Sequence, residues 1–182
     1  MEKRSLIKSL SLFGLTVALV SAVLAVLNWL PSLMQERTMK RFASVDEAKK
    51  ELRLKGLFLP TYIPEHLNLA WPPAEVYAQT VPFSAFIMHL HYKDRKETGL
   101  VIQQTDANAP YQIKPLMKIR EETAGSKITI KNRQANLVRA LCEGDIPCSE
   151  VSWNENGTII TIICACSTQD AIKIASSTLP EP

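Results

Sequence analysis

Residues 151–164 have the sequence VSWNENGTIITIIC, which is the most explicit indication of the fold in the chain. Apolar runs flank Asn156-Gly157, a dipeptide that type I′ turns favour because both central residues need a positive φ. Setting Glu155 opposite Thr158 makes one face of the hairpin continuously apolar, through the cross-strand pairs Trp153–Ile160 and Val151–Ile162. The stretch therefore predicts an antiparallel β-hairpin that buries one face.

Alternation with a period of two recurs elsewhere in the chain. An earlier predicted strand has one face made of Phe86, Met88, Leu90 and Tyr92. A polar turn at residues 94–97 then leads to the apolar run 100–102, so these segments predict a second hairpin. Further strands are expected at residues 128–130 and 136–141. Together the segments predict one antiparallel sheet.

Two amphipathic helices are predicted at the ends of the same domain. Ser44-Val45-Asp46-Glu47 is a capping box, in which the Ser44 hydroxyl accepts from the Glu47 amide and the Glu47 side chain accepts from the Ser44 amide. Gly56 is expected to end this helix. A second N-cap, Ser167, begins a helix that runs until Leu179-Pro180. Helices packed on one face of an antiparallel sheet give the fold class α+β.

A long apolar segment precedes the domain. The 27 residues between Lys8 and Glu36 carry no charge, and residues 10–30 consist mainly of Leu, Val and Ala. This length suffices to cross about 30 Å of hydrocarbon, so residues 9–30 are predicted to form a transmembrane helix. A cleaved signal peptide is the alternative, because Val23-Leu24-Ala25 has the small-residue pattern of a cleavage site.

The charges divide unevenly along the 182-residue chain. Residues 1–43 carry six Lys/Arg and two Glu, whereas residues 44–182 carry fifteen Lys/Arg and sixteen Asp/Glu. A near-neutral domain has no electrostatic surface for a phosphate backbone, so nucleic-acid binding is excluded. The basic N-terminus and the cysteines favour a single-pass cell-membrane protein whose N-terminus is cytoplasmic. In this arrangement residues 1–8 form a cytoplasmic tail, residues 31–43 a juxtamembrane linker and residues 44–182 an extracytoplasmic domain. The lipid bilayer is then a partner of the N-terminal helix.

Residues 59–67, LPTYIPEHL, resemble the LP-x-YLP-x-G opening of an uncharacterised bacterial extracytoplasmic domain family. That family occurs on single-pass membrane proteins and behind anti-sigma-factor-like regions. Trp153, Asn156-Gly157 and the segment 171–177 are similar to the ending of the same family, while His66 stands where Gly is usual. The resemblance covers about residues 44–180, and it implies an extracytoplasmic fold without a known activity or catalytic residue.

The main candidate site residues are four cysteines, Cys142, Cys148, Cys164 and Cys166. Disulfides are the favoured interpretation outside the cell, and three complete pairings are open. A Cys142–Cys148 bond closes a turn-rich loop and contributes about 2 to 2.5 kcal/mol in the chain-entropy model. Cys164 and Cys166 share a strand face, where a mutual bond is strained, so pairing of each with a loop cysteine is an alternative. A zinc site or a redox-active Cys-Ala-Cys are the functional alternatives, although the spacing fits zinc poorly.

His89 and His91 form a His-x-His pattern on one predicted strand. Such a pair can ligate a metal, but the sequence supplies no further ligand except a speculative His66. Alternation in the strand instead predicts a solvent-facing pair, so neither a metal nor another cofactor is predicted.

Enzyme motifs are absent from the sequence, including Walker, G-x-G-x-x-G, G-x-S-x-G, H-E-x-x-H and C-x-x-C-H patterns. The chain is therefore predicted not to be an enzyme. The favoured function is a membrane-anchored extracytoplasmic interaction or sensing module with an unidentified protein partner. The alternative is a thiol-redox or metal-handling protein that uses the four cysteines with His89 and His91.

Overall fold

The computed structural model describes residues 14, 16–21, 23–24, 39–54, 56–110, 113, 117, 119–122, 124–142 and 144–180. Its contacts divide the chain into two compact units, Met1–Thr38 and Met39–Pro182. The described residues of the first unit have helical backbone and are exposed. The elements below belong to the second unit.

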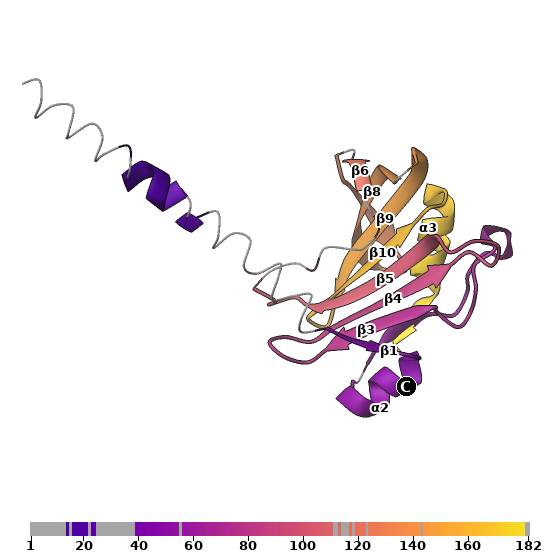
Figure 1. Ribbon diagram of the computed structural model, residues 1–182. Coiled ribbons are helices and arrows are strands. Elements are labelled where there is room, and N and C mark those ends of the chain that lie inside the picture. The colour runs from indigo at the N-terminus through magenta and orange to yellow at the C-terminus, as the bar shows by residue number, and fades with distance from the viewer. Residues whose placement is uncertain are drawn as a thin grey trace, which may run out of the picture. The chain divides into compact units, whose positions relative to one another are not determined.

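One large antiparallel sheet forms the frame of the second unit (Figure 1). Nine strands of this sheet lie in the described part of the chain. Eight of them follow the spatial order β1 (Lys40–Phe42), β3 (Glu75–Gln79), β4 (Ala85–His91), β5 (Thr98–Asp106), β10 (Thr158–Cys164), β9 (Ile146–Glu155), β8 (Arg133–Cys142) and β6 (Ile119–Glu122). The ninth, β7 (Ser126–Ile130), pairs with the first half of β8.

The remaining elements are short. Two α-helices, α2 (Val45–Leu52) and α3 (Thr168–Ser177), accompany the 3-10 helix η1 (Glu65–Leu67). A separate two-stranded antiparallel sheet joins β2 (Phe58–Pro60) to β11 (Thr178–Pro180). Because β11 follows α3 directly, this small sheet ties the C-terminal end of α3 to the segment that leads into η1.

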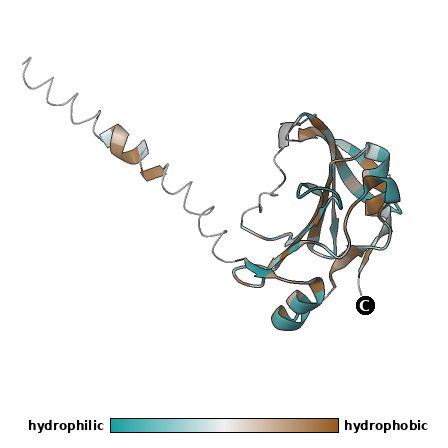
Figure 2. Cartoon of the chain, turned by 45° about the vertical axis from the view of Figure 1, so that its right-hand side comes forward, coloured by the Kyte–Doolittle hydropathy of each residue, from teal (hydrophilic) through white to brown (hydrophobic). Residues whose placement is uncertain are grey.

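Alternation along the central strands gives the large sheet two buried faces. We call the face that carries Phe86, Ile102 and Ile162 the helix face, because α3 packs on it through Ala171, Ile174 and Ala175 (Figure 2). The opposite face, here the second face, carries Ile87, Val101 and Ile163 and forms its own apolar cluster. Ile113 and Met117, from the connection between β5 and β6, belong to this second cluster.

The predicted hairpin at residues 151–164 is confirmed in its register. Trp153 lies opposite Ile160 and Val151 opposite Ile162, and all four residues are buried on the helix face. Asn156 and Gly157 have φ values of 52° and 82°, as a type I′ turn requires. The turn dipeptide and the apolar pairs therefore select one register together.

Both predicted helix starts are present, with one difference in the first. The Ser44 hydroxyl accepts from the Glu47 amide at 3.1 Å, but the Glu47 carboxylate accepts from the amide of Ala43, not from that of Ser44. This helix also ends before Gly56, because Arg53 takes the left-handed conformation and closes it.

The predicted fold class, α+β with an N-terminal transmembrane helix, is wrong. The structure is a β-rich domain, since antiparallel strands hold far more of its described residues than helices do, and the α-helices α2 and α3 have only eight and ten residues. Among the described residues, no helix combines the length and the apolar character needed to cross a bilayer. Most of the predicted span, residues 9–30, lies outside the described residues.

Candidate functional site

One disulfide joins Cys142, the last residue of β8, to Cys148 in β9. The two strands form a hairpin, so their Cα atoms lie 5.8 Å apart, within the usual range for a disulfide. Both residues belong to the apolar cluster on the second face and are 3–4% exposed. The bond therefore closes the end of this hairpin inside a core.

The second disulfide joins Cys164 to Cys166 across a single residue. A mutual bond looked unfavourable from the sequence, because two residues on one face of a straight strand lie almost 7 Å apart. In the structure β10 ends at Cys164 and the chain bends before α3, so the Cα–Cα distance is only 5.1 Å. The Ser149 hydroxyl donates to the carbonyl oxygen of Cys166 at 3.4 Å and holds this bend against β9.

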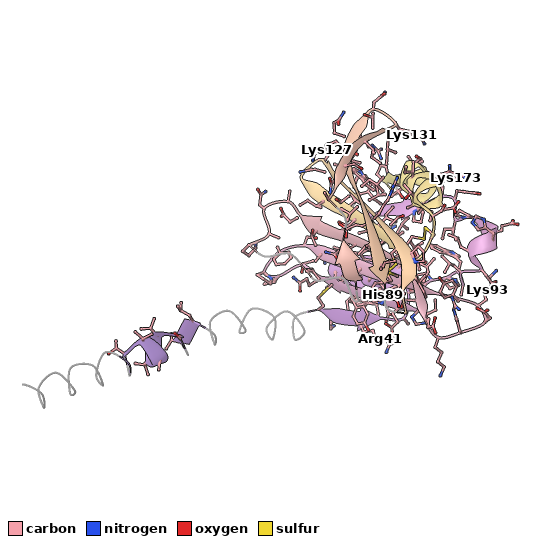
Figure 3. The ribbon with its side chains drawn as sticks, turned by 90° about the horizontal axis from the view of Figure 1, so that it is seen from above. Arg41, His89, Lys93, Lys127, Lys131 and Lys173 are labelled. Atoms are coloured by element: carbon pink, nitrogen blue, oxygen red, sulfur yellow. A yellow bond between two sulfur atoms is a disulfide. The ribbon has the colours of Figure 1, made fainter. Side chains whose placement is uncertain are left out.

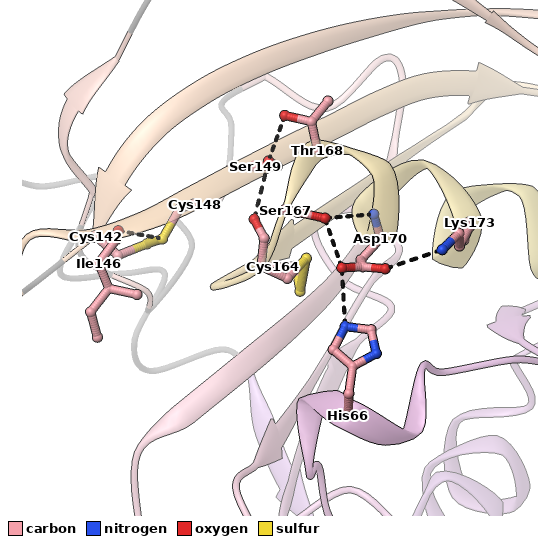
Figure 4. Close-up of a disulfide and its surroundings, with 11 residues drawn as sticks. His66, Cys142, Ile146, Cys148, Ser149, Cys164, Ser167, Thr168, Asp170 and Lys173 are labelled. Carbon is pink, nitrogen blue, oxygen red and sulfur yellow. Dashed lines mark hydrogen bonds and ion pairs between the residues drawn. A yellow bond between two sulfur atoms is a disulfide. The ribbon is translucent and has the colours of Figure 1, made fainter.

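The two disulfides lie at the same end of β8, β9 and β10 but on opposite faces of the sheet (Figure 4). Cys164 and Cys166 are 1% and 8% exposed and belong to the cluster beneath α3. Only a thiolate acts as a nucleophile or ligates a metal, and a sulfur atom in a disulfide is not a thiolate. Each bond thus fastens one of the two cores, and none of the four sulfur atoms is available as a thiolate in this state.

Asp170 is the centre of a polar cluster next to the second disulfide (Figure 4). Its Oδ2 atom accepts from the Ser167 hydroxyl at 2.7 Å and lies 3.1 Å from Nε2 of His66, while Lys173 lies 3.5 Å from Oδ1. The hydrogen bond from Ser167 has the largest effect on the pKa of the Asp170 carboxyl and lowers it. Burial raises this pKa, whereas His66 and Lys173 lower it further. The cluster ties η1 to the first turn of α3.

This cluster has the residue types of a serine triad but not its arrangement. In a triad the imidazole lies between serine and carboxylate, where it can take the hydroxyl proton. Here Ser167 donates directly to Asp170, and the exposed His66 contacts the same carboxylate oxygen. The cluster therefore serves as a cap and a clamp, and the spacing Ser167-x-x-Asp170 was its only signal in the sequence.

The prediction of a solvent-facing histidine pair is wrong for His89, which is only 2% exposed. His89 lies on the second face, which is covered and holds buried polar residues beside its apolar ones. His91 is half-buried at the end of the same strand, and His66 lies on η1 at the other face. Within the described residues, no group of three or more His, Cys, Asp or Glu residues is placed to hold a metal ion.

Glu75 contacts His89, and Tyr77 and Arg41 contact the same Glu75 carboxylate; none of the three was predicted to be a site residue. Glu75 is the register partner of His89, and its Oε2 atom lies 3.4 Å from Nδ1 of the imidazole. Tyr77 donates to the same oxygen at 3.2 Å, and Arg41 donates to Oε1 at 3.2 Å. Glu75 thereby joins β1, β3 and β4 through a single carboxylate.

Burial dominates the electrostatics of this group. It lowers the pKa of His89, the Glu75 carboxylate opposes that change, and His91 adds a smaller lowering. Burial also raises the pKa of the Tyr77 hydroxyl, and the negative charge of Glu75 raises it further. At neutral pH the group therefore holds a neutral imidazole, a neutral phenol and one Arg–Glu ion pair.

A cavity of about 220 Å³ opens at the other end of the helix face. Its lining includes the apolar residues Leu54, Leu57 and Phe86 and the polar residues Ser84, Asp106 and Thr158. The side-chain amide of Gln104 accepts a hydrogen bond from the backbone N–H of Phe58 and donates one to its carbonyl oxygen. These two bonds link the large sheet to β2.

Comparison with protein families, with curated proteins and with solved structures finds no match for this chain. The resemblance of residues 59–67 to an extracytoplasmic domain family stays a prediction from the sequence. In the structure these residues form the end of β2, the following turn and η1, and Thr61 and Tyr62 bind Ser177 at the end of α3.

Proposed function

We propose that the protein is an extracytoplasmic interaction or sensing module without catalytic activity. The observation that carries the proposal is the state of the four cysteines, each of which is buried in a local disulfide. Such bonds form and persist in oxidising compartments and are rare in the cytosol, so they support a domain that folds and works outside the cytoplasm. Attachment to a lipid bilayer through the apolar N-terminal segment stays a prediction.

A binding role fits the distribution of polar side chains. Three polar side chains at or near the core bind neighbouring groups: Gln104 holds Phe58, Asp170 caps α3, and Glu75 joins three strands. These contacts fix the fold, and none of them aligns a nucleophile with a base. Rigid surfaces of this kind suit recognition of a partner, with loops and the cavity near Asp106 as the accessible regions.

The thiol-redox alternative makes a different prediction for the two cysteine pairs. The test measures how well each of two double variants restores the phenotype of a deletion strain. The variants are Cys142→Ala/Cys148→Ala and Cys164→Ala/Cys166→Ala, and each serves as the control for the other. A binding module keeps its function whenever the variant folds, as judged by circular dichroism of the purified protein. Loss of function confined to one pair, in a variant that is folded, would contradict the proposal.

An activity assay provides the second arm of the test. The full chain is incubated with a disulfide-containing protein substrate and reduced glutathione, and turnover is followed over time. We expect no turnover above the rate of glutathione alone, because buried disulfides exchange slowly with external thiols. Catalysed reduction, or co-purification of a stoichiometric metal ion, would favour the redox or metal-handling function.

A further inference from the structure

A single carboxylate on the second face is shared by groups from three strands. Glu75 of β3 contacts Arg41 of the edge strand β1 and His89 of β4, and Figure 3 shows Arg41 and His89 at the same end of the domain. Tyr77, also from β3, adds a hydrogen bond to the same group. Any change of charge at one of these groups is therefore felt by the others.

The contacts of His89 fix which nitrogen carries its proton. Nδ1 lies 3.4 Å from Oε2 of the Glu75 carboxylate, which favours the proton on this nitrogen, so in the neutral ring Nε2 carries the lone pair. Nε2 is buried and has no hydrogen-bond partner in the part of the chain that the structure describes. A free lone pair on a buried base, with a carboxylate behind the other nitrogen, is a position where a proton can bind.

The neighbouring strand places a second unpartnered acceptor on the same face. Gln103 lies on the same face of β5, two residues from Val101, the register partner of His89. Its Nε2 donates to the carbonyl oxygen of Ile113, but its Oε1 is buried without a partner among the described residues. Protonation of His89 would supply a donor on a face that now has two unpartnered acceptors.

Adding this proton changes the balance of charge around Glu75. The neutral state has one cation, Arg41, for one carboxylate; the protonated state has two cations for the same carboxylate. The Arg41 side chain is 63% exposed, whereas that of His89 is 3% exposed. Water can therefore stabilise Arg41 away from Glu75, but the buried imidazolium has no comparable alternative.

We propose that His89 is a proton-binding site coupled through Glu75 to the edge strand β1. Uptake of a proton from solvent forms an N–H bond at Nε2, draws the carboxylate toward the imidazolium and weakens the Arg41–Glu75 pair that fastens β1 to β3. The inference deepens the proposed sensing role and depends on it for its use in the cell. The coupling itself is a property of the folded domain and is measured without a partner.

The described groups that face His89 are few. Glu75 of β3 and His91 of β4 act on the pKa of His89 directly, and the Tyr77 ring lies beside the imidazole. Arg41 of β1 contacts the same Glu75 carboxylate, while β5 places the uncharged Val101 and Gln103 on this face. Burial makes the proton harder to bind, so the pKa of His89 lies below its ordinary value and the change occurs on the acid side of pH 6.5. The site therefore responds to acidification.

Histidine titration by NMR tests the coupling from the side of the proton. The full chain has three histidines, so three imidazole signals are followed from pH 8 to 4 and assigned with single His→Gln variants. Arg41→Gln is expected to raise the pKa of His89, because it removes a neighbouring cation. Lys127→Gln, which removes an exposed cation on β7, is the matched control and is expected to leave that pKa unchanged.

Hydrogen exchange tests the same coupling from the side of β1. After correction for the intrinsic pH dependence of exchange, amides of residues 40–42 are expected to lose protection as His89 titrates, and the His89→Gln variant is expected to lose this response. Should His89→Gln disturb folding, Glu75→Gln gives the same readout by removing the shared carboxylate. An equal pKa of His89 in the Arg41→Gln and wild-type chains, or an unchanged pH response in both variants, would overturn the inference. Either result would leave the proposal based on the disulfides unaffected.

Discussion

Replacement of Trp153 by alanine measures how much the central hairpin contributes to the domain. The ring is 5% exposed on the helix face, between Ile160 of β10 and Ala135 of β8. Burial of about 200 Å² at about 25 cal/mol/Å² corresponds to roughly 5 kcal/mol. Alanine keeps the Cβ, and the indole N–H has no partner among the described residues, which offsets about 1 kcal/mol. We therefore expect Trp153→Ala to reduce the free energy of unfolding by about 3 to 4 kcal/mol.

Urea denaturation of the full chain, followed by circular dichroism, provides this free energy from the transition midpoint and its slope. Trp71→Ala is the matched control, since Trp71 is 55% exposed and its loss is expected to change stability by less than about 0.5 kcal/mol. Equal effects of the two substitutions would refute the assignment of Trp153 to the buried face. The register of β9 and β10 would then also need revision.

Three further results are expected. Gly157 has φ of 82°, so Gly157→Val is expected to destabilise the fold by about 1 to 3 kcal/mol, whereas Gly157→Asn is mild; urea midpoints of both variants decide this, and equal midpoints would contradict the type I′ turn. Because the pKa of Asp170 is lowered in the folded state, its carboxylate stabilises the fold above pH 3.8, and this contribution is lost as the pH falls through the folded pKa. Asp170→Asn is expected to flatten the dependence of the free energy of unfolding on pH in that window. An unchanged pH dependence would contradict the role of Asp170 in joining η1 to α3. For His89, whose pKa is also lowered, stability is expected to fall as pH decreases below 6.5, and His89→Gln should remove this fall; persistence of the fall in the variant would assign it to another group.

The sequence contained the local features of the fold and not its long-range ones. Asn156-Gly157 and the apolar pairs around it determine a register between residues that are close in the chain, and the Ser167 cap determines the start of α3 in the same way. The strands β1, β2 and β11 have three residues each, two of them with a proline, and become strands only because distant partners pair with them. Short segments of this kind have no periodicity from which they could be predicted.

The four cysteines are identifiable from the sequence, but the group formed by Glu75 and His89 is not, for the same reason. His89 looked exposed because polar residues alternate with apolar ones in β4, but Ile113 and Met117, distant in sequence, help to cover that face. Its partner Glu75 belongs to β3, which the sequence did not predict as a strand, so their pairing has no sequence signal. The bond between Cys164 and Cys166 likewise depends on where β10 ends, a boundary that alternation alone does not define.

The proposed function of a non-catalytic extracytoplasmic domain depends on two local, structural disulfides. Mass spectrometry of peptides from the full chain, purified without reductant and treated with an alkylating reagent before digestion, tests this most directly. We expect peptides linked through Cys142–Cys148 and Cys164–Cys166, with no alkylated cysteine. Alkylated thiols in the native protein, or a link between one of Cys142 and Cys148 and one of Cys164 and Cys166, would contradict it.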